Sequence, residues 1–236
     1  MPITLVDQND NPIYMPIPNP NPTPSPFNIT LFDNHLPYDT HNTYSITIDT
    51  TLTIQTLLTC SPIHVESWLL ETQSLSPAII GLDIEWRPNS QRGQSNPAAT
   101  LQLYTNNRCL IFQLIHSPSI PTFLFTFLSN PNNRFVGVGI ESDIEKIIED
   151  YNLTVANYVD LRNLAADVLE DRDLLRSGIK TLAERVLGKI VEKPSRITRS
   201  RWDNPMLDWD QVKYATVDAF LSFEIARRLY SHQVIE

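Results

Sequence analysis

Apolar and polar residues follow strand-like and helix-like patterns along most of the chain. Residues 44–48 alternate polar with apolar side chains, as in a strand with one buried face, and the β-branched run at 78–86 predicts a strand in the core. Residues 100–105 and 108–114 predict two more strands, and the Asn106-Asn107 pair between them is typical of a hairpin turn. These segments predict a sheet that contains antiparallel strands.

Helical patterns alternate with strands through the rest of the chain. Ser61 followed by Pro62 is typical of a helix start, and Ser142 with Glu145 forms a capping box that predicts another. Further helices are predicted at 123–128, 161–170, 178–187 and about 210–230, and short strands at 134–138 and near 158–159. Three antiparallel strands followed by strand–helix–strand crossovers predict an α/β sandwich, with a mixed central sheet and helices on both faces.

The N-terminal segment differs in composition from the remainder. Nine of the eighteen prolines precede residue 38, and residues 12–26 alternate proline with Asn, Ile, Thr and Ser. That composition favours an extended, unpacked segment. With 236 residues, of which 42% are hydrophobic, the chain is long enough for one domain with a sizeable core. We therefore expect a disordered tail at 1–27 and a folded domain at 28–236.

The chain is acidic overall, with a net charge of −9, but its charges are unevenly distributed. Residues 176–201 carry eight basic and two acidic side chains, a local surplus that would attract a polyanion. The alternative interpretation is a solvated helix face and loop. The sequence shows neither an apolar run of about 18 residues nor a signal-peptide pattern, so we expect a nuclear or cytoplasmic protein that is not secreted. Two cysteines are too few for a disulfide framework or a zinc cluster.

The strand at 78–86 carries two acids on one face. Because alternate side chains of a strand share a face, Asp83 and Glu85 point the same way, opposite to Leu82 and Ile84. Keeping two neighbouring carboxylates ionised and buried costs free energy, and each raises the pKa of the other. A bound divalent cation offsets that free-energy cost. The alternative is an edge strand with both acids in water. The pair therefore indicates either a cation site or a solvated edge.

Two further acids lie in helical segments. Asp218 follows Tyr214 by one turn in an apolar helix, so their side chains share a face. An Asp in such a helix either has a buried partner or belongs to a solvent-facing stripe with Tyr214 and Lys213. Asp143 comes soon after Gly139 in the first turn of a predicted helix, where the helix dipole favours an acid whatever its function. Each feature is weak by itself.

Taken together, these features occur in a recognisable order. The Asp-x-Glu pair, the later Val-Gly-x-Gly-Ile-x-x-Asp segment and the terminal Tyr-x-x-x-Asp resemble the motifs of the DEDD-type 3′–5′ exonucleases, in the subclass that carries the tyrosine. Within that subclass the chain is most similar to the Werner-syndrome-type exonuclease domain, and more loosely to ribonuclease D. The resemblance extends over about residues 49–229 and leaves the N-terminal tail outside.

The resemblance implies a ribonuclease H-like fold and a 3′–5′ exonuclease domain. It also implies that Asp83, Glu85, Asp143 and Asp218 hold two Mg²⁺ or Mn²⁺ ions. One ion would activate a water that Tyr214 orients, and the other would neutralise the departing 3′ oxygen. The product would be a nucleoside 5′-monophosphate.

Basic and aromatic side chains near the acids would bind the substrate, which is DNA or RNA with a free 3′ end. The loop after the acidic strand supplies Arg87 and Arg92, an assignment that rests on adjacency alone. The basic segment would supply phosphate contacts and a stacking ring from Lys189, Lys193, Arg196, Arg199, Arg201 and Trp202. Packing of Trp202 against the sheet is the alternative for that ring.

Two other functions stay open on the sequence alone. One is a catalytically lapsed nucleic-acid-binding module on the same fold, against which the presence of all four acids and the tyrosine argues. The other is a scaffold whose N-terminal tail recruits a partner. The sequence leaves open DNA against RNA, a single strand against a recessed duplex end, and a monomer against a homo-oligomer.

Overall fold

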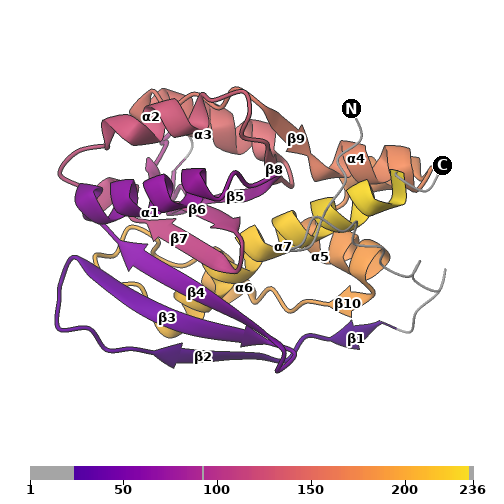
Figure 1. Cartoon of the computed structure of the whole chain (residues 1–236), viewed down its shortest axis with the longest axis horizontal. Helices are drawn as coiled ribbons and strands as arrows, with labels where there is room; N and C mark the ends of the chain where they lie inside the picture. Colours follow the sequence, from indigo (N-terminus) through magenta and orange to yellow (C-terminus); the bar gives the residue numbers. More distant parts are fainter. Residues whose placement is uncertain (1–23, 92, 234–236) are drawn as a thin grey trace.

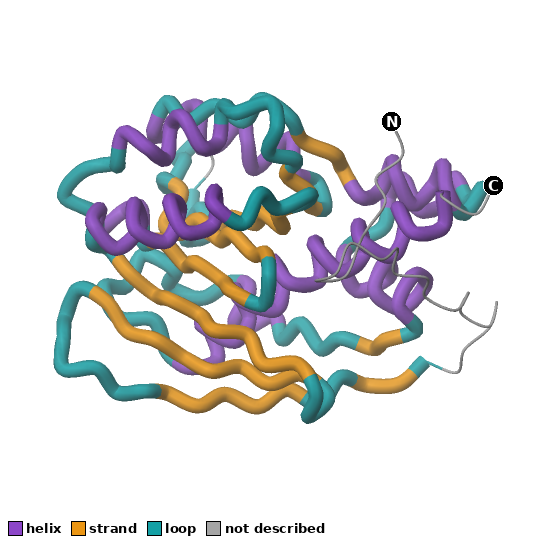
Figure 2. The backbone as a smooth tube through the Cα atoms, in the orientation of Figure 1, coloured by secondary structure: helices purple, strands orange, loops and turns teal. Residues whose placement is uncertain are grey.

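An eight-stranded mixed sheet forms the framework of the computed structural model, which describes residues 24–91 and 93–233 (Figure 1). In spatial order the strands are β2 (Ile29–Asp33), β3 (His41–Ile48), β4 (Leu52–Thr59), β7 (Arg108–Phe112), β6 (Ala98–Thr105), β5 (Ile80–Trp86), β8 (Phe135–Gly137) and β9 (Tyr158–Asp160). Strands β5, β6 and β7 are antiparallel, and β8 and β9 continue from β5 in parallel, as the sequence predicted. Figure 2 shows the strands of this sheet in orange.

Helices cover both faces of the sheet and enclose a core on each side. The helices are α1 (Pro62–Ser74), α2 (Thr122–Leu128), α3 (Ile140–Tyr151), α4 (Leu161–Val168), α5 (Ile179–Leu182), α6 (Ser195–Thr198) and α7 (Trp209–Gln233). The first three pack on one face, and α4, α5 and α7 pack on the other. The mixed sandwich predicted from the sequence is therefore confirmed. None of the described helices has the length and apolarity needed to cross a membrane.

The predicted hairpin joins β6 to β7 through Asn106 and Asn107. Both residues have positive φ angles, 50° and 57°, which a two-residue turn between twisted strands requires. Asparagine and aspartate are among the non-glycine residues that adopt this left-handed backbone most readily. The turn thus fixes the register of the two central strands.

The sheet extends further toward the N-terminus than the sequence pattern indicated. Strands β2 and β4 were not predicted, and with β3 they add an antiparallel meander to the sheet edge. The predicted boundary at residue 28 is also too late. Ser25–Pro26 forms β1, which pairs with β10 (Lys189–Ile190), and the Phe27 ring packs edge-on against Phe220 at 6.3 Å. Residues 1–23 of the predicted tail lie outside the described residues.

Two helix predictions differ in detail from the structure. Helix α3 begins at Ile140, with Gly139 as its N-cap at a φ of 73°, so Ser142 and Glu145 lie inside the helix and the predicted capping box is wrong. The left-handed glycine makes the turn that a serine cap would otherwise make. The helix predicted at 178–187 is α5 followed by a π turn at Ala183–Leu187.

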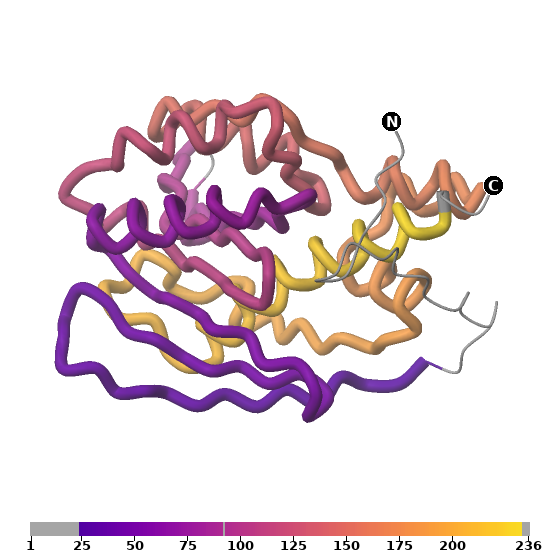
Figure 3. Tube along the Cα trace, viewed as in Figure 1, coloured from indigo at the N-terminus to yellow at the C-terminus, as the bar shows by residue number. Residues whose placement is uncertain are grey.

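Helix α7 crosses β5 at very short range. A Cβ atom built at Gly81 would lie 2.0 Å from the carbonyl oxygen of Ala219, so only glycine admits this crossing. Asp83 lies two residues further along β5, and Asp218 precedes Ala219 on α7. Figure 3 shows the yellow C-terminal helix passing the magenta strands, far from it in the sequence. The glycine contact therefore brings the two acid-bearing elements together.

Candidate metal centre and active site

The pleat of β5 separates its acids from its apolar side chains. Ile80, Leu82 and Ile84 are buried in the core beneath α1, α2 and α3. Asp83 and Glu85 therefore face the opposite side, toward α7. This is the orientation that the alternation in the sequence predicted.

Three carboxylates converge where α7 crosses β5. Asp83, Glu85 and Asp218 each offer one oxygen atom, and these oxygens all lie within 4.8 Å of one another. Asp218 is only 4% exposed. The predicted site thus draws together side chains from a strand and a helix that are more than a hundred residues apart in the sequence.

Asp143 lies close to this cluster but outside its tightest part. It is in the first turn of α3 and is 9% exposed. Its charge raises the pKa of Asp83, which places the two carboxylates within electrostatic range. The charged groups that shift the pKa of Asp143 itself are Asp160, the N-cap of α4, and Arg162, whose guanidinium pairs with Asp160 at 2.5 Å.

Burial makes the ionised forms of these acids unfavourable. It raises the pKa values of Asp83 and Glu85 well above their ordinary range, and the neighbouring carboxylates raise them further. Burial also raises the pKa of Asp218, against the opposing effects of Lys193 and of a hydrogen bond with Tyr214. For Asp143, burial and the charge of Asp160 raise the pKa to about 7.

These groups fit a divalent cation. Oδ2 of Asp83 is buried and has no hydrogen-bond partner among the described residues, so one ligand atom is left unsatisfied by the protein. All the available donors are carboxylate oxygens, which suit Mg²⁺ and Mn²⁺. A bound cation would favour the ionised forms that burial disfavours.

Two further side chains complete the cluster. The Tyr214 hydroxyl hydrogen-bonds with Asp218, one helical turn away, as their spacing predicted. Lys193, in the loop between β10 and α6, donates to Oδ2 of Asp218 and lies over the Tyr214 ring at 4.7 Å from its centroid. The sequence predicted Lys193 as a contact to substrate phosphate. No local pattern could have placed its ammonium among the acids, because a loop carries it there.

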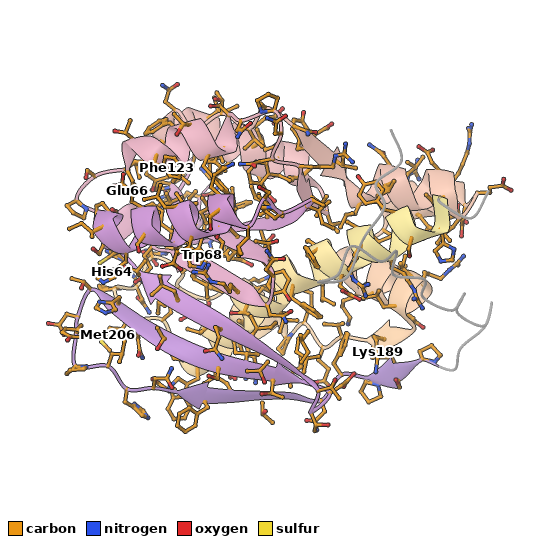
Figure 4. All side chains as sticks on the ribbon, viewed as in Figure 1. His64, Glu66, Trp68, Phe123, Lys189 and Met206 are labelled. Atoms are coloured by element: carbon orange, nitrogen blue, oxygen red, sulfur yellow. The ribbon has the colours of Figure 1, made fainter. Side chains whose placement is uncertain are left out.

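Four of the other predicted nucleic-acid-binding residues form ion pairs with acids outside the cluster. These pairs are Arg87 with Asp203 at 3.4 Å, Lys189 with Asp49 at 2.7 Å, Arg196 with Asp210 at 2.6 Å, and Arg201 with Asp203 at 3.2 Å. Arg199 is exposed, and Arg92 lies outside the described residues. Figure 4 labels Lys189, which is the first residue of β10 and pairs with Ser25 of β1. Their role in substrate binding stays a prediction.

Trp202 is the exception among these residues. Its side chain is 0% exposed and its ring centroid lies 5.9 Å from that of Tyr214. A ring with no exposed surface cannot stack on a base, so the prediction of a stacking role was wrong. Burying the large apolar indole stabilises the fold more than exposing it to solvent would. Trp202 therefore packs in the core, beside the ring of Tyr214.

A cavity of about 400 Å³ adjoins the cluster. Tyr214 and Asp218 of α7 line it together with Arg196 and Lys213, and Pro26 of β1 and Ile190 of β10 also line it. Of the four predicted acids, Asp218 is the one that lines this cavity.

The raised pKa values predict how the metal-free protein responds to pH. A carboxyl whose pKa is higher in the folded than in the unfolded state stabilises the fold fully below its unfolded pKa, and loses this contribution as pH rises through the folded pKa. For Asp143 the window runs from 3.8 to about 7. We expect the melting temperature, measured in a chelator, to fall across this range, and Asp143→Asn to flatten the profile. If the melting temperature of Asp143→Asn depended on pH in the same way as that of wild type, the raised pKa could not be that of Asp143.

Comparisons with known proteins agree with this geometry. A family model described as 3′–5′ exonuclease matches residues 61–232. An Arabidopsis thaliana protein named 3′–5′ exonuclease is 32% identical over 154 residues, which cover 64% of this chain and 52% of that protein. The mouse protein named bifunctional 3′–5′ exonuclease/ATP-dependent helicase WRN is 30% identical over 152 residues, which cover 64% of this chain and 11% of that protein. The chain thus matches about half or less of the length of these relatives.

A solved structure shares the fold. The exonuclease domain of Aedes aegypti Nibbler superposes with a TM-score of 0.63 over 75% of this chain and 88% of that chain, at 20% sequence identity. The ribonuclease H-like architecture expected from the sequence is confirmed by this likeness and by the strand order.

Proposed function

The chain belongs to the 3′–5′ exonuclease family, and on this premise we propose that it removes nucleotides from the 3′ end of DNA or RNA in a reaction that requires Mg²⁺ or Mn²⁺. The observation that carries the proposal is the convergence of Asp83, Glu85 and Asp218 within 4.8 Å, with Asp143 nearby. Asp83 and Glu85 are half-buried and Asp218 is buried, and the one ammonium of Lys193 beside three carboxylates leaves their pKa values raised. Their presence is explained if the protein binds cations there.

The acids of β5 and α7 would hold the ions, and Asp143 would complete the set. Two divalent ions held there would supply stabilisation of the negative charge on the attacking and leaving oxygens of an in-line displacement at phosphorus. Water adds its oxygen to the phosphorus, the bond from phosphorus to the 3′ oxygen breaks, and that oxygen gains a proton. The products are a nucleoside 5′-monophosphate and a strand shorter by one nucleotide.

Tyr214 is suited to orient the attacking water. Burial and the carboxylates of Asp218 and Glu85 raise the pKa of its hydroxyl far above its ordinary value, so the group stays protonated at neutral pH. Its hydrogen bond with Asp218 fixes the hydroxyl beside the acids. A protonated phenol donates one hydrogen bond and accepts another, which suits it to position a water rather than to remove its proton.

Tyr214→Phe is expected to lower kcat by about 10- to 100-fold, because the ring keeps its packing while the water loses its orienting hydroxyl. Mn²⁺ affinity, measured by titration calorimetry, should change little, since the four carboxylates remain. The Tyr158→Phe variant is a control, because that exposed tyrosine lies on β9. Equal rates for wild type and Tyr214→Phe would show that the hydroxyl takes no part in the reaction.

Release of mononucleotides tests the function directly. The substrates are matched DNA and RNA oligonucleotides labelled at the 5′ end, as single strands and as recessed duplexes, each with Mg²⁺, Mn²⁺ or a chelator. A ladder that shortens from the 3′ end only with metal supports the proposal. Binding of the oligonucleotides without shortening, under every metal condition, would support a lapsed binding module instead.

A further inference from the structure

Lys193 carries its ammonium into the acidic cluster itself. Nζ donates to Oδ2 of Asp218, which is one of the three clustered carboxylates, and lies over the Tyr214 ring at 4.7 Å from its centroid. The side chain is only 21% exposed. The charge of Lys193 also acts on Asp83 and on Glu85 and favours their ionised forms. This lysine is therefore the counter-ion of the whole cluster.

Three lysines elsewhere in the described part of the chain pair with acids outside the cluster, and they are Lys146, Lys189 and Lys213. Lys146 pairs with Asp150 at 2.8 Å in a pair that is about as buried, but Asp150 is the single carboxylate it contacts. Lys189 pairs with Asp49. Lys193 also pairs directly with one carboxylate, but that carboxylate, Asp218, belongs to the group of three clustered acids, whereas Asp150 and Asp49 are outside it.

The ammonium and a divalent cation compete for the same place. The ammonium contacts an oxygen of Asp218, a metal ion held by the cluster would also need an oxygen of Asp218, and two cations at such short range repel each other strongly in a site of low dielectric. The carboxylates prefer the doubly charged ion, which accepts several oxygen ligands at once. Binding of the metal ion thus requires the ammonium to move away from Asp218.

We propose that Lys193 is a placeholder cation, which offsets part of the charge of the acidic cluster before metal binds and is displaced from Asp218 when a divalent ion enters. The inference rests on the proposed function, because it takes the three acids as the metal site. Lys193 lies on a loop between β10 and α6, and its flexible stem adjoins residues that line the 400 Å³ cavity. Once displaced, the ammonium becomes available to a phosphate of a strand bound in that cavity.

Lys193→Met tests this by removing the charge while keeping most of the stem. Mn²⁺ should bind at least about tenfold more tightly than to wild type, because the ion no longer displaces an ammonium. The metal-free variant should melt at a lower temperature, since the acids lose their counter-ion, and saturating Mn²⁺ should raise its melting temperature more than it raises that of wild type. Titration calorimetry and thermal melts measure both quantities.

Lys146→Met is the matched control. It leaves Asp150 unpaired and should also lower the melting temperature, but it should leave Mn²⁺ affinity unchanged, because Asp150 is outside the cluster. Lys193→Arg retains a cation and should hold Mn²⁺ affinity near or below that of wild type. The arginine variant also keeps the inference testable if Lys193→Met does not fold, since affinity above that of wild type would overturn it.

The possible results distinguish a failure of this inference from a failure of the proposed function. If wild type and Lys193→Met bind Mn²⁺ equally well, or the variant binds more weakly, the placeholder role is overturned while the metal site stands. If wild type binds no Mn²⁺ at millimolar concentrations and Lys193→Met does, the placeholder is supported in an extreme form. If neither protein binds the ion, the metal-dependent function itself fails, and the placeholder role is overturned with it.

Discussion

The Asp83→Asn variant is expected to lose nuclease activity by about a thousandfold or more, and its metal-free form is expected to melt at a higher temperature than wild type. Both effects come from one carboxylate. Asp83 supplies a ligand oxygen that no other described group satisfies, and burial with Asp218 and Asp143 nearby raises its pKa well above its ordinary range. A neutral amide of the same size gives up the metal ligand but also removes a disfavoured buried charge.

Opposite changes in activity and stability distinguish a functional acid from a structural one. Mononucleotide release, Mn²⁺ titration and thermal melts in a chelator measure the three quantities on the same preparation. Glu224→Gln is the control on α7, because Glu224 pairs with Arg227 away from the cluster and should keep wild-type activity and metal affinity. If Asp83→Asn retained activity within about tenfold of wild type, the strand acids could not be the centre of the reaction.

Gly81→Ala is expected to destabilise the fold by about 3 kcal/mol or more. The added Cβ would lie 2.0 Å from the carbonyl oxygen of Ala219 and 3.1 Å from the backbone nitrogen of Phe223. Both are backbone atoms of α7 and cannot rotate away, so the helix itself has to move off β5. That movement would also separate Asp218 from Asp83, and the variant should lose metal affinity together with stability.

Denaturant unfolding and Mn²⁺ titration measure these two effects. Gly178→Ala is the control substitution, because a Cβ added at Gly178 would meet no neighbouring group within 4 Å and the φ of −86° there suits any residue. It should change stability by less than about 1 kcal/mol. A Gly81→Ala protein with wild-type stability would show that α7 does not depend on this close crossing.

Local patterns predicted the acidic face of β5 and the central hairpin correctly. The two-residue period of a strand places Asp83 opposite Leu82 whatever the surrounding fold, and Asn106-Asn107 carries its own backbone preference. Strand β4 was missed although Leu52, Ile54 and Leu58 alternate with polar residues, so its signal was present. The cap of α3 was misplaced because Gly139 and Ser142 both suit a helix start, and only the packed chain selects between them.

The sequence by itself determined which acids share a strand face, which tyrosine lies one turn from Asp218, and the order of motifs that marks the family. Only the tertiary structure decided that α7 meets β5 at Gly81, that Trp202 is buried and that the ammonium of Lys193 enters the cluster. The physical reason is range: backbone periodicity acts over a few residues, whereas burial and the pairing of charges depend on which distant segments pack together.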